Sequence, residues 1–293
     1  MSFSGEIREE LVGQYAKARH CDLAELSAIL HVCGDFSEDR AGICTAKFRT
    51  ENFPVARKCF TLMKKTFNIV TYIAIRRNPQ KGSWSYMLCW KGDELLAIRD
   101  VMVQAACCKR AYIRGAYLAA GSVSDPKKSY HFEIVCGREE EAKYLQNMIN
   151  TFGLDAKIVI RKHNYIVYLK EGAQIVDVLN VMGASSGLME LENIRILKEM
   201  RNSVNRQVNC ETANIKKVVS AAVRQKEDII YIRDVIGFDR LPESLKAIAL
   251  ARLEYPDAPL KDLGAVLEPP LGKSGVNHRL RKLSEIADKL RRQ

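Results

Sequence analysis

The sequence predicts an α+β fold in two parts: a pseudo-twofold domain of two αββαββα repeats, followed by an all-α domain. Two observations predict it. A set of short strands and amphipathic helices occurs twice in the first 195 residues, and the residues that follow are polar and helical in their spacing. A length of 293 residues is enough for two domains with cores of their own.

The chain begins with a predicted N-terminal helix over residues 1–20. Ser4 is its expected N-cap, and Ile7, Leu11 and Tyr15 would share one face. The repeat domain follows over residues 21–195.

The two repeats are expected at about 21–107 and 108–195. Strands are predicted where short segments are rich in β-branched or aromatic residues, at 43–49, 70–77, 85–90, 130–136, 156–161 and 165–170. Helical apolar spacing predicts helices at 54–67 and 139–152. We expect the strands of both repeats to form one mixed surface.

Each repeat opens with a segment of similar character, LSAILHVCG (26–34) and IRGAYLAAG (113–121), 87 residues apart. Both are rich in small residues: Ser27, Ala28 and Gly34 in the first, and Gly115, Ala116, Ala119 and Gly121 in the second. Small side chains let two helix backbones approach closely. These segments are therefore expected to be paired helices on the pseudo-twofold axis.

After residue 195 we expect a helical linker at 196–210 and an all-helical domain at 211–293. The stretch NCETAN (209–214) predicts a break and a new N-cap. Pro242 would occupy the first position of a helix that stops at Pro256, and a second helix is expected at 259–267.

The segment EPPLG (268–272) then breaks the chain before a third, basic helix. The apolar stripe of that helix comprises Val276, Leu280, Leu283, Ala287 and Leu290. Two short helices, a tight break and a basic third helix are typical of a helix-turn-helix, whose last helix enters the major groove.

Charge supports a polyanionic partner. The net charge is +11, and residues 273–293 alone carry seven Lys or Arg against two acids. The residues predicted to bind double-stranded DNA are Lys273, Ser274, Asn277, His278, Arg279, Arg281 and Lys282.

These residues are expected to have different roles. Arg281 can pair with a guanine edge and Asn277 with adenine. Lys273 and Lys282 should contact phosphate. Arg279 lies nearer the apolar stripe, so we expect it at the edge, where it meets phosphate or a neighbouring helix.

Other functions find less support. A basic amphipathic helix can also lie on a membrane surface, but the ordered helix–break–helix context favours DNA. The sequence GKS at 272–274 lacks the glycine of a phosphate-binding loop, because Leu267 stands there. The N-terminus does not resemble a signal peptide, and no apolar run is long enough to span a bilayer. We expect a cytoplasmic, nucleoid-associated protein with no cofactor and no small-molecule substrate.

The cysteines predict no metal site. None of the nine forms a CxxC pair, so a zinc site would have to be assembled from distant positions, and buried reduced thiols are the simpler interpretation. They stand at positions 21, 33, 44, 59, 89, 107, 108, 136 and 210.

The paired segments resemble degenerate copies of the LAGLIDADG motif, which forms the central helix pair of homing endonucleases. In that family the carboxylate before the final glycine of each copy binds the catalytic divalent metals. Here Cys33 and Ala120 occupy these positions. Hard cations need oxygen ligands, so the resemblance implies an inactive site and a protein that is not an enzyme. Asp35 and Asp125 lie nearby, but neither has an acidic counterpart in the other copy.

The whole chain resembles the WhiA family, whose members join a LAGLIDADG-like domain to a C-terminal helix-turn-helix. Residues 108–134 and 259–290 carry the clearest similarity. The resemblance implies a transcription regulator, linked to cell division, chromosome segregation and sporulation, without endonuclease activity. Other transcription or division proteins would be further partners. Two alternatives remain open: a nucleoid or cell-division scaffold that uses DNA only for localisation, and a residual LAGLIDADG endonuclease.

Overall fold

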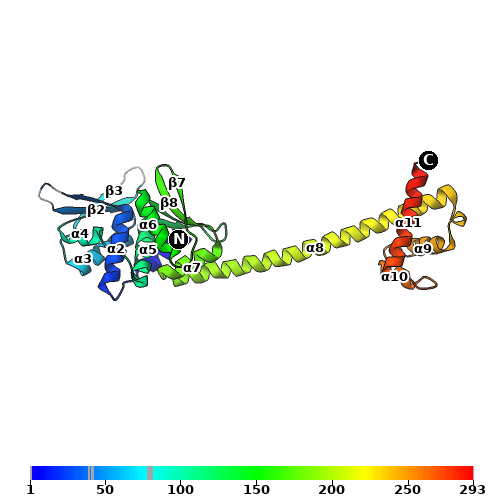
Figure 1. Cartoon of the computed structure of the whole chain (residues 1–293), viewed down its shortest axis with the longest axis horizontal. Helices are drawn as coiled ribbons and strands as arrows, with labels where there is room; N and C mark the ends of the chain where they lie inside the picture. The colour runs from blue at the N-terminus through cyan, green and yellow to red at the C-terminus, as the bar shows by residue number, and fades with distance from the viewer. Residues whose placement is uncertain (1, 39, 41–42, 78–81, 293) are drawn as a thin grey trace. The chain divides into compact units, whose positions relative to one another are not determined.

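The computed structural model describes residues 2–38, 40, 43–77 and 82–292, and the chain divides into two compact units (Figure 1). The first unit spans Met1–Glu199 and the second Met200–Gln293. Helix α8 (Ser185–Ile236) begins in the first unit and ends in the second. Across the described ranges, no helix is both long and apolar enough to cross a membrane.

The first unit contains the predicted pair of αββαββα repeats, preceded by helix α1 (Phe3–Val12). The first repeat consists of α2 (Arg19–Cys33), β1 (Gly34–Glu38), β2 (Cys44–Thr50), α3 (Phe53–Phe67), β3 (Tyr72–Arg77), β4 (Trp84–Lys91) and α4 (Glu94–Arg99). The second consists of α5 (Ala106–Ala120), β5 (Gly121–Val123), β6 (Phe132–Cys136), α6 (Glu139–Asn150), β7 (Lys157–Arg161), β8 (Asn164–Leu169) and α7 (Gly172–Met182). The fold class predicted from the sequence is confirmed.

Each repeat forms its own four-stranded sheet, with strand orders β1-β2-β4-β3 and β5-β6-β8-β7. The expected single mixed surface is wrong, because every strand pairing among the described residues is antiparallel and lies within one repeat. Figure 1 shows the reason: helices α2 and α5 lie together between β2 and β3 on one side and β7 and β8 on the other. The sequence analysis also missed strands β1 and β5, whose sequences GDFSE and GSV are polar or very short.

Small residues bring helices α2 and α5 together, as the motif predicted. A Cβ atom added at Gly115 would lie 2.3 Å from the carbonyl oxygen of Glu25 and 3.0 Å from the Cβ of Ala28. Ala28 and Ala116 are fully buried. Only glycine therefore permits this approach of the two backbones at Gly115.

A buried ion cluster joins the helix pair to α3. Glu25 and Lys58 are both fully buried, and their side chains are 2.5 Å apart. Glu25 also accepts two hydrogen bonds from Arg114, at 2.8 and 3.1 Å. Lys58 donates to the carbonyl oxygens of Leu11 and Gln14 at 2.7 Å each. Every charge in the cluster thus has partners, as burial requires.

Helix α1 is shorter than expected, and its N-cap lies two residues before the predicted one. Ser2, not Ser4, is its N-cap, because the Ser2 hydroxyl accepts from the Gly5 amide. Ser4 instead lies within hydrogen-bonding distance of the Tyr117 hydroxyl. The helix ends at Val12, so Tyr15 lies beyond it and is 43% exposed.

The second unit is all-helical. It contains the end of α8, a 3-10 turn (Phe238–Arg240), α9 (Glu243–Glu254), α10 (Leu260–Ala265) and α11 (Lys273–Arg291). Pro242 is the N-cap of α9 and not its first residue, and α10 is shorter than the predicted 259–267.

The break predicted at residues 209–214 is wrong, because α8 continues through it. The segment is exposed, yet Asn and Thr lower helix propensity only slightly, and no Gly or Pro occurs between Leu188 and Ile236 to stop the helix.

Candidate nucleic-acid interface

Helix α11 packs through one apolar stripe against the other helices of its unit. Val276, Leu280, Leu283 and Ala287 are at most 1% exposed. They share a core with residues of α8, α9 and α10 that include Ile232, Ile248 and Leu263. This packing orients the opposite face of α11 away from the core.

A close backbone contact fixes the turn between α10 and α11. The Leu271 amide donates to the carbonyl oxygen of Gly264 at 2.9 Å. A Cβ atom added at Gly264 would lie 2.0 Å from the Leu271 carbonyl oxygen. Glycine at this position therefore lets the chain enter α11 directly above α10, as a helix-turn-helix requires.

Six of the seven residues predicted to bind DNA lie on the exposed face of α11. They are Lys273, Ser274, Asn277, His278, Arg281 and Lys282. Gly272 is the N-cap of the helix and provides no side-chain cap, so the amides of the first turn stay available to an anion. The face thus combines exposed polar and cationic side chains with the amides of a helix N-terminus.

Arg279 differs from the other six. It is half-buried, and its guanidinium donates to the carbonyl oxygen of Ser244 in α9 at 3.3 Å. Of the two partners expected for it, the neighbouring helix is the one found in the structure.

Asn277 and Arg281 border a groove of about 320 Å³ between α11 and α8, which Ala221 and Gln225 line from the other side. The Arg281 side chain is 71% exposed and lies 3.4 Å from Glu285, one turn further along. Such an exposed pair is weak, so Arg281 can exchange it for another partner.

Sequence reasoning missed two features of this surface. Lys261 is exposed on α10, the helix that crosses the phosphate backbone in this motif. Arg291, one of the seven basic residues counted at 273–293, is 2.7 Å from Asp228 of α8, whose side chain is 1% exposed. Spacing alone cannot separate a basic residue that pairs internally from one that stays free.

The degenerate motif positions lie at the last residues of the paired helices, Cys33 in α2 and Ala120 in α5. Burial raises the pKa of the Cys33 thiol to about 11, so the thiol stays protonated at neutral pH. Asp35 is exposed on β1, opposite Lys47 of β2. Asp125 accepts from the Lys127 amide at 2.9 Å and so closes a turn.

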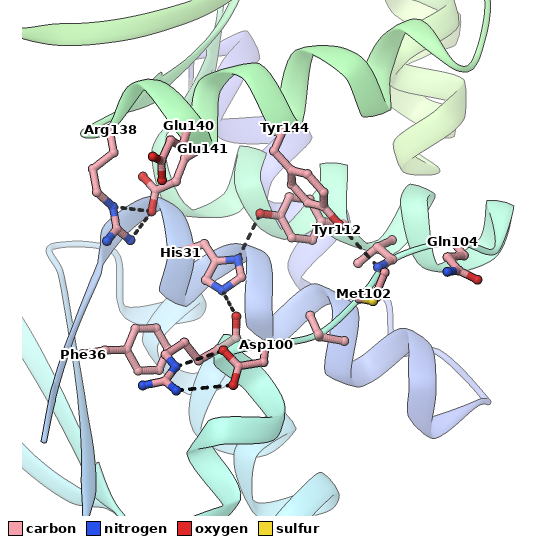
Figure 2. Close-up of a pocket in the computed structure, with 13 residues that line it drawn as sticks. His31, Phe36, Asp100, Met102, Gln104, Tyr112, Arg138, Glu140, Glu141 and Tyr144 are labelled. Atoms are coloured by element: carbon pink, nitrogen blue, oxygen red, sulfur yellow. Dashed lines mark hydrogen bonds and ion pairs between the residues drawn. The ribbon is translucent and has the colours of Figure 1, made fainter. Parts of the chain in front are cut away.

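A cleft of about 590 Å³ lies beside this end of α2 (Figure 2). His31 in its wall is held at both ring nitrogens, with Nε2 2.9 Å from the Arg99 carbonyl oxygen and Nδ1 3.2 Å from the Tyr112 hydroxyl. Burial lowers the pKa of His31. The acid Glu141 is already paired with Arg138. Glu140 and Asp100 also line the cleft, and Asp100 is paired with Arg99.

Comparison with known proteins identifies each part of the chain. Residues 19–100 match the model of the WhiA N-terminal LAGLIDADG-like domain, and residues 109–201 match that of the WhiA LAGLIDADG-like domain. Residues 204–287 match the WhiA C-terminal HTH domain.

Relatives and solved structures agree with these models. The chain is 54% identical to the probable cell division protein WhiA of Lachnoclostridium phytofermentans, over 99% of this chain and all of the relative. It is 49% identical to the protein of the same name in Alkaliphilus oremlandii, over 99% and 98% of the two chains. The crystal structure of full-length DUF199/WhiA from Thermotoga maritima matches with a TM-score of 0.65 and 25% identity, over 99% of both chains.

Proposed function

The chain belongs to the WhiA family, and we propose that it is a transcription regulator that binds duplex DNA through helix α11 and does not cut it. One observation carries the proposal: the face of α11 opposite its buried stripe exposes Lys273, Asn277, Arg281 and Lys282. These side chains can read bases and bind phosphates. The relatives' name, probable cell division protein, supports cell division as the process regulated. The family resemblance adds chromosome segregation and sporulation.

Each part of the helix-turn-helix has its own role in this proposal. Helix α11 enters the major groove with its N-terminal half, where Asn277 and Arg281 meet base edges. The uncapped first turn and Lys273 bind the phosphates that flank the groove. Lys261 on α10 adds a contact to the backbone. The protein therefore acts in the cytoplasm, on the nucleoid.

Binding of the full chain to duplex DNA at several salt concentrations tests the interface. Affinity should fall steeply with salt, because each Lys or Arg contact to phosphate releases a counterion. Lys273→Ala and Lys282→Ala together should reduce the slope of log affinity against log salt by about 2, since each phosphate contact contributes roughly 0.9. An unchanged slope would place the interface elsewhere.

The regulatory role is tested in cells, by comparing genome-wide occupancy with transcript levels after deletion. Sharp occupancy at promoters whose transcripts change supports regulation. Broad occupancy without transcript changes would overturn it and favour the scaffold alternative.

The absence of nuclease activity follows from the helix ends. Cys33 and Ala120 provide no carboxylate at the positions where metal would bind. Supercoiled plasmid incubated with the protein and Mg²⁺ or Mn²⁺ should stay intact. Nicking that copurifies with the protein and disappears in Asp35→Ala would contradict this part of the proposal.

A further inference from the structure

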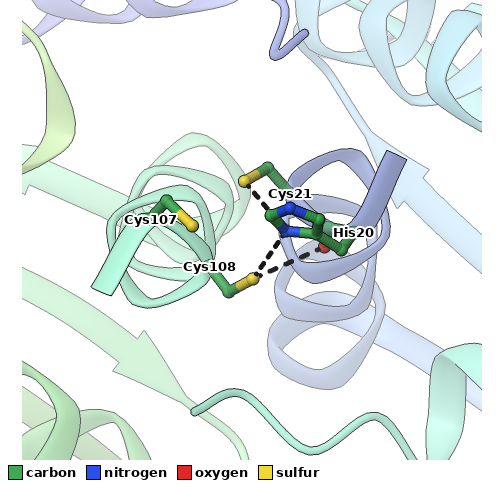
Figure 3. A group of neighbouring side chains, drawn as sticks. All are labelled: His20, Cys21, Cys107 and Cys108. Atoms are coloured by element: carbon green, nitrogen blue, oxygen red, sulfur yellow. Dashed lines mark hydrogen bonds between the residues drawn. The ribbon is translucent and has the colours of Figure 1, made fainter. Parts of the chain in front are cut away.

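Four side chains that can bind a metal meet at the N-terminal ends of helices α2 and α5. His20 and Cys21 lie in the first turn of α2, and Cys107 and Cys108 lie in the first turn of α5. One ligand atom from each side chain lies within 4.8 Å of all the others (Figure 3). Over the described ranges of the chain, no other group of three or more His, Cys, Asp or Glu side chains is gathered in this way.

The cluster follows the internal symmetry of the fold. Cys107 stands 87 residues after His20, and Cys108 stands 87 residues after Cys21, which is the offset between the two motif segments. Equivalent positions of the two repeats therefore face each other across the pseudo-twofold axis. The ligands stand 12 or 13 residues before Cys33 and Ala120, so this site lies about 18–20 Å along the helix pair from the degenerate motif positions.

We propose that His20, Cys21, Cys107 and Cys108 bind one zinc ion in a tetrahedral Cys₃His site. Nδ1 of His20 is 3.0 Å from Sγ of Cys108 and 3.3 Å from Sγ of Cys21. In a tetrahedral zinc site these nitrogen–sulfur distances are about 3.5 Å, and sulfur–sulfur distances are about 3.8 Å. Small side-chain rotations are sufficient to bring all four atoms to bonding distance. Three thiolates and an imidazole favour zinc over magnesium or calcium, which prefer oxygen.

Charge and access also fit a bound ion. Zinc with three thiolates and a neutral histidine carries a net charge of −1. Cys21 and Cys107 line a cleft of about 600 Å³ that Arg110 also lines, so a cation faces the charged site. The N-termini of two helices meet at this place, so both motif helices contribute ligands from their first turns. The cleft gives the ion a route to the ligands.

The ion would bridge the N-terminal ends of α2 and α5. Gly115 already brings the helices into backbone contact further along. A metal bridge at the first turns adds a second fixed point, contributed by both repeats. The site is therefore structural, with all four positions filled by protein ligands.

The zinc content of the full chain tests the proposal. The protein is purified under reducing conditions without chelator, equilibrated with zinc, desalted and analysed by mass spectrometry for metal. We expect one zinc ion per chain. Substitution with Co²⁺ should give intense visible bands of a tetrahedral site and a thiolate-to-cobalt charge-transfer band. Far less than one zinc per chain, or cobalt spectra without the thiolate band, would overturn the proposal.

Matched variants identify the ligands. Cys107 is exposed like its control Cys210, whereas Cys108 is buried and its control Cys89 is half-buried. Cys108→Ser and Cys107→Ser should each lower zinc affinity by more than roughly 100-fold. Loss of a residue that only supports a ligand costs up to about that much, so loss of a ligand itself should cost more. Cys89→Ser and Cys210→Ser should keep wild-type affinity.

A folding defect does not hide the result, because Cys107 is exposed and its replacement leaves the core intact; circular dichroism checks this. Equal affinity in all four variants would contradict the assignment. A Cys21–Cys108 disulfide in the reduced preparation would contradict it as well.

Discussion

Replacement of Arg281 by alanine should relax sequence preference at one base pair with little effect on stability. The side chain is 71% exposed, and its contact to Glu285 is an exposed pair one helical turn apart. Such pairs contribute roughly 0.3–0.5 kcal/mol, so the free energy of unfolding should fall by no more than this. A bidentate contact to a guanine edge provides about 1–3 kcal/mol of discrimination, which corresponds to a loss of roughly 5- to 150-fold in preference at one base pair.

Two neighbouring variants make the comparison specific. Lys282 is exposed beside Arg281 and is expected to meet phosphate, so Lys282→Ala should weaken binding about equally on all sequences. Lys289 is exposed eight residues further along α11, about 12 Å away, and Lys289→Ala should change neither property. The assay is binding-site selection with each full-length variant, followed by affinity measurement on the selected site and on scrambled DNA. If Arg281→Ala keeps the wild-type preference at every position, the orientation assigned to α11 is wrong.

Three further predictions concern packing and buried charged groups in the two units. Gly264→Ala should destabilise the second unit by about 1–3 kcal/mol, because the added Cβ would clash with a backbone carbonyl oxygen. Gly275→Ala is the control and should be neutral or stabilising, because its Cβ meets only a flexible leucine side chain. Thermal unfolding and DNA affinity are measured for both variants. Lys58→Ala should lower the free energy of unfolding in denaturant by about 3 kcal/mol, because it leaves the buried Glu25 carboxylate with one partner fewer. Replacement of the exposed Lys64 on the same helix by alanine should change it very little. Similar losses in the two variants would contradict the burial argument. Burial lowers the pKa of His31 in the folded chain below its ordinary value of 6.5. At and below pH 6.5 the unfolded chain therefore binds more protons than the folded chain. The stability that is present above pH 6.5 is lost as the pH falls towards the folded-state pKa. His31→Gln should therefore lose less stability than the wild type between pH 7 and pH 5, and an equal loss would refute the assignment.

Much of the fold could be predicted because apolar periodicity reports which side chains are buried. The stripe of α11 was placed from spacing alone; Val276, Leu280, Leu283 and Ala287 are buried, and Leu290 at its end is partly buried against the same core. Periodicity fails where burial is absent. The middle of α8 is exposed, so no buried face there shows from the sequence that the helix continues. The predicted break rested only on residues that lower helix propensity slightly.

Pairing of charges was the other limit of sequence reasoning. The roles of Arg279 and Arg291 depend on Ser244 and Asp228, which come from other helices. A helical wheel gives the face on which a side chain lies, but not the side chain that a neighbouring helix brings to that face. A count of basic residues on α11 therefore does not reveal that Arg291 is paired with Asp228.

The same limit explains why no metal site was predicted at the helix N-termini. Search by spacing finds ligands that are close along the chain, whereas His20 and Cys107 are 87 residues apart and meet only through the repeat. Internal symmetry brings equivalent residues together on its axis, so the two ends of the paired helices are the places where a duplicated fold can most readily build a site. At one end the equivalent positions are Cys33 and Ala120, which cannot hold a hard cation. At the other end the equivalent positions carry thiols and an imidazole, which suit a soft one. A duplicated helix pair without carboxylates at its C-terminal ends can therefore hold a structural metal at its N-terminal ends, because the ligand sets of the two ends are independent of each other.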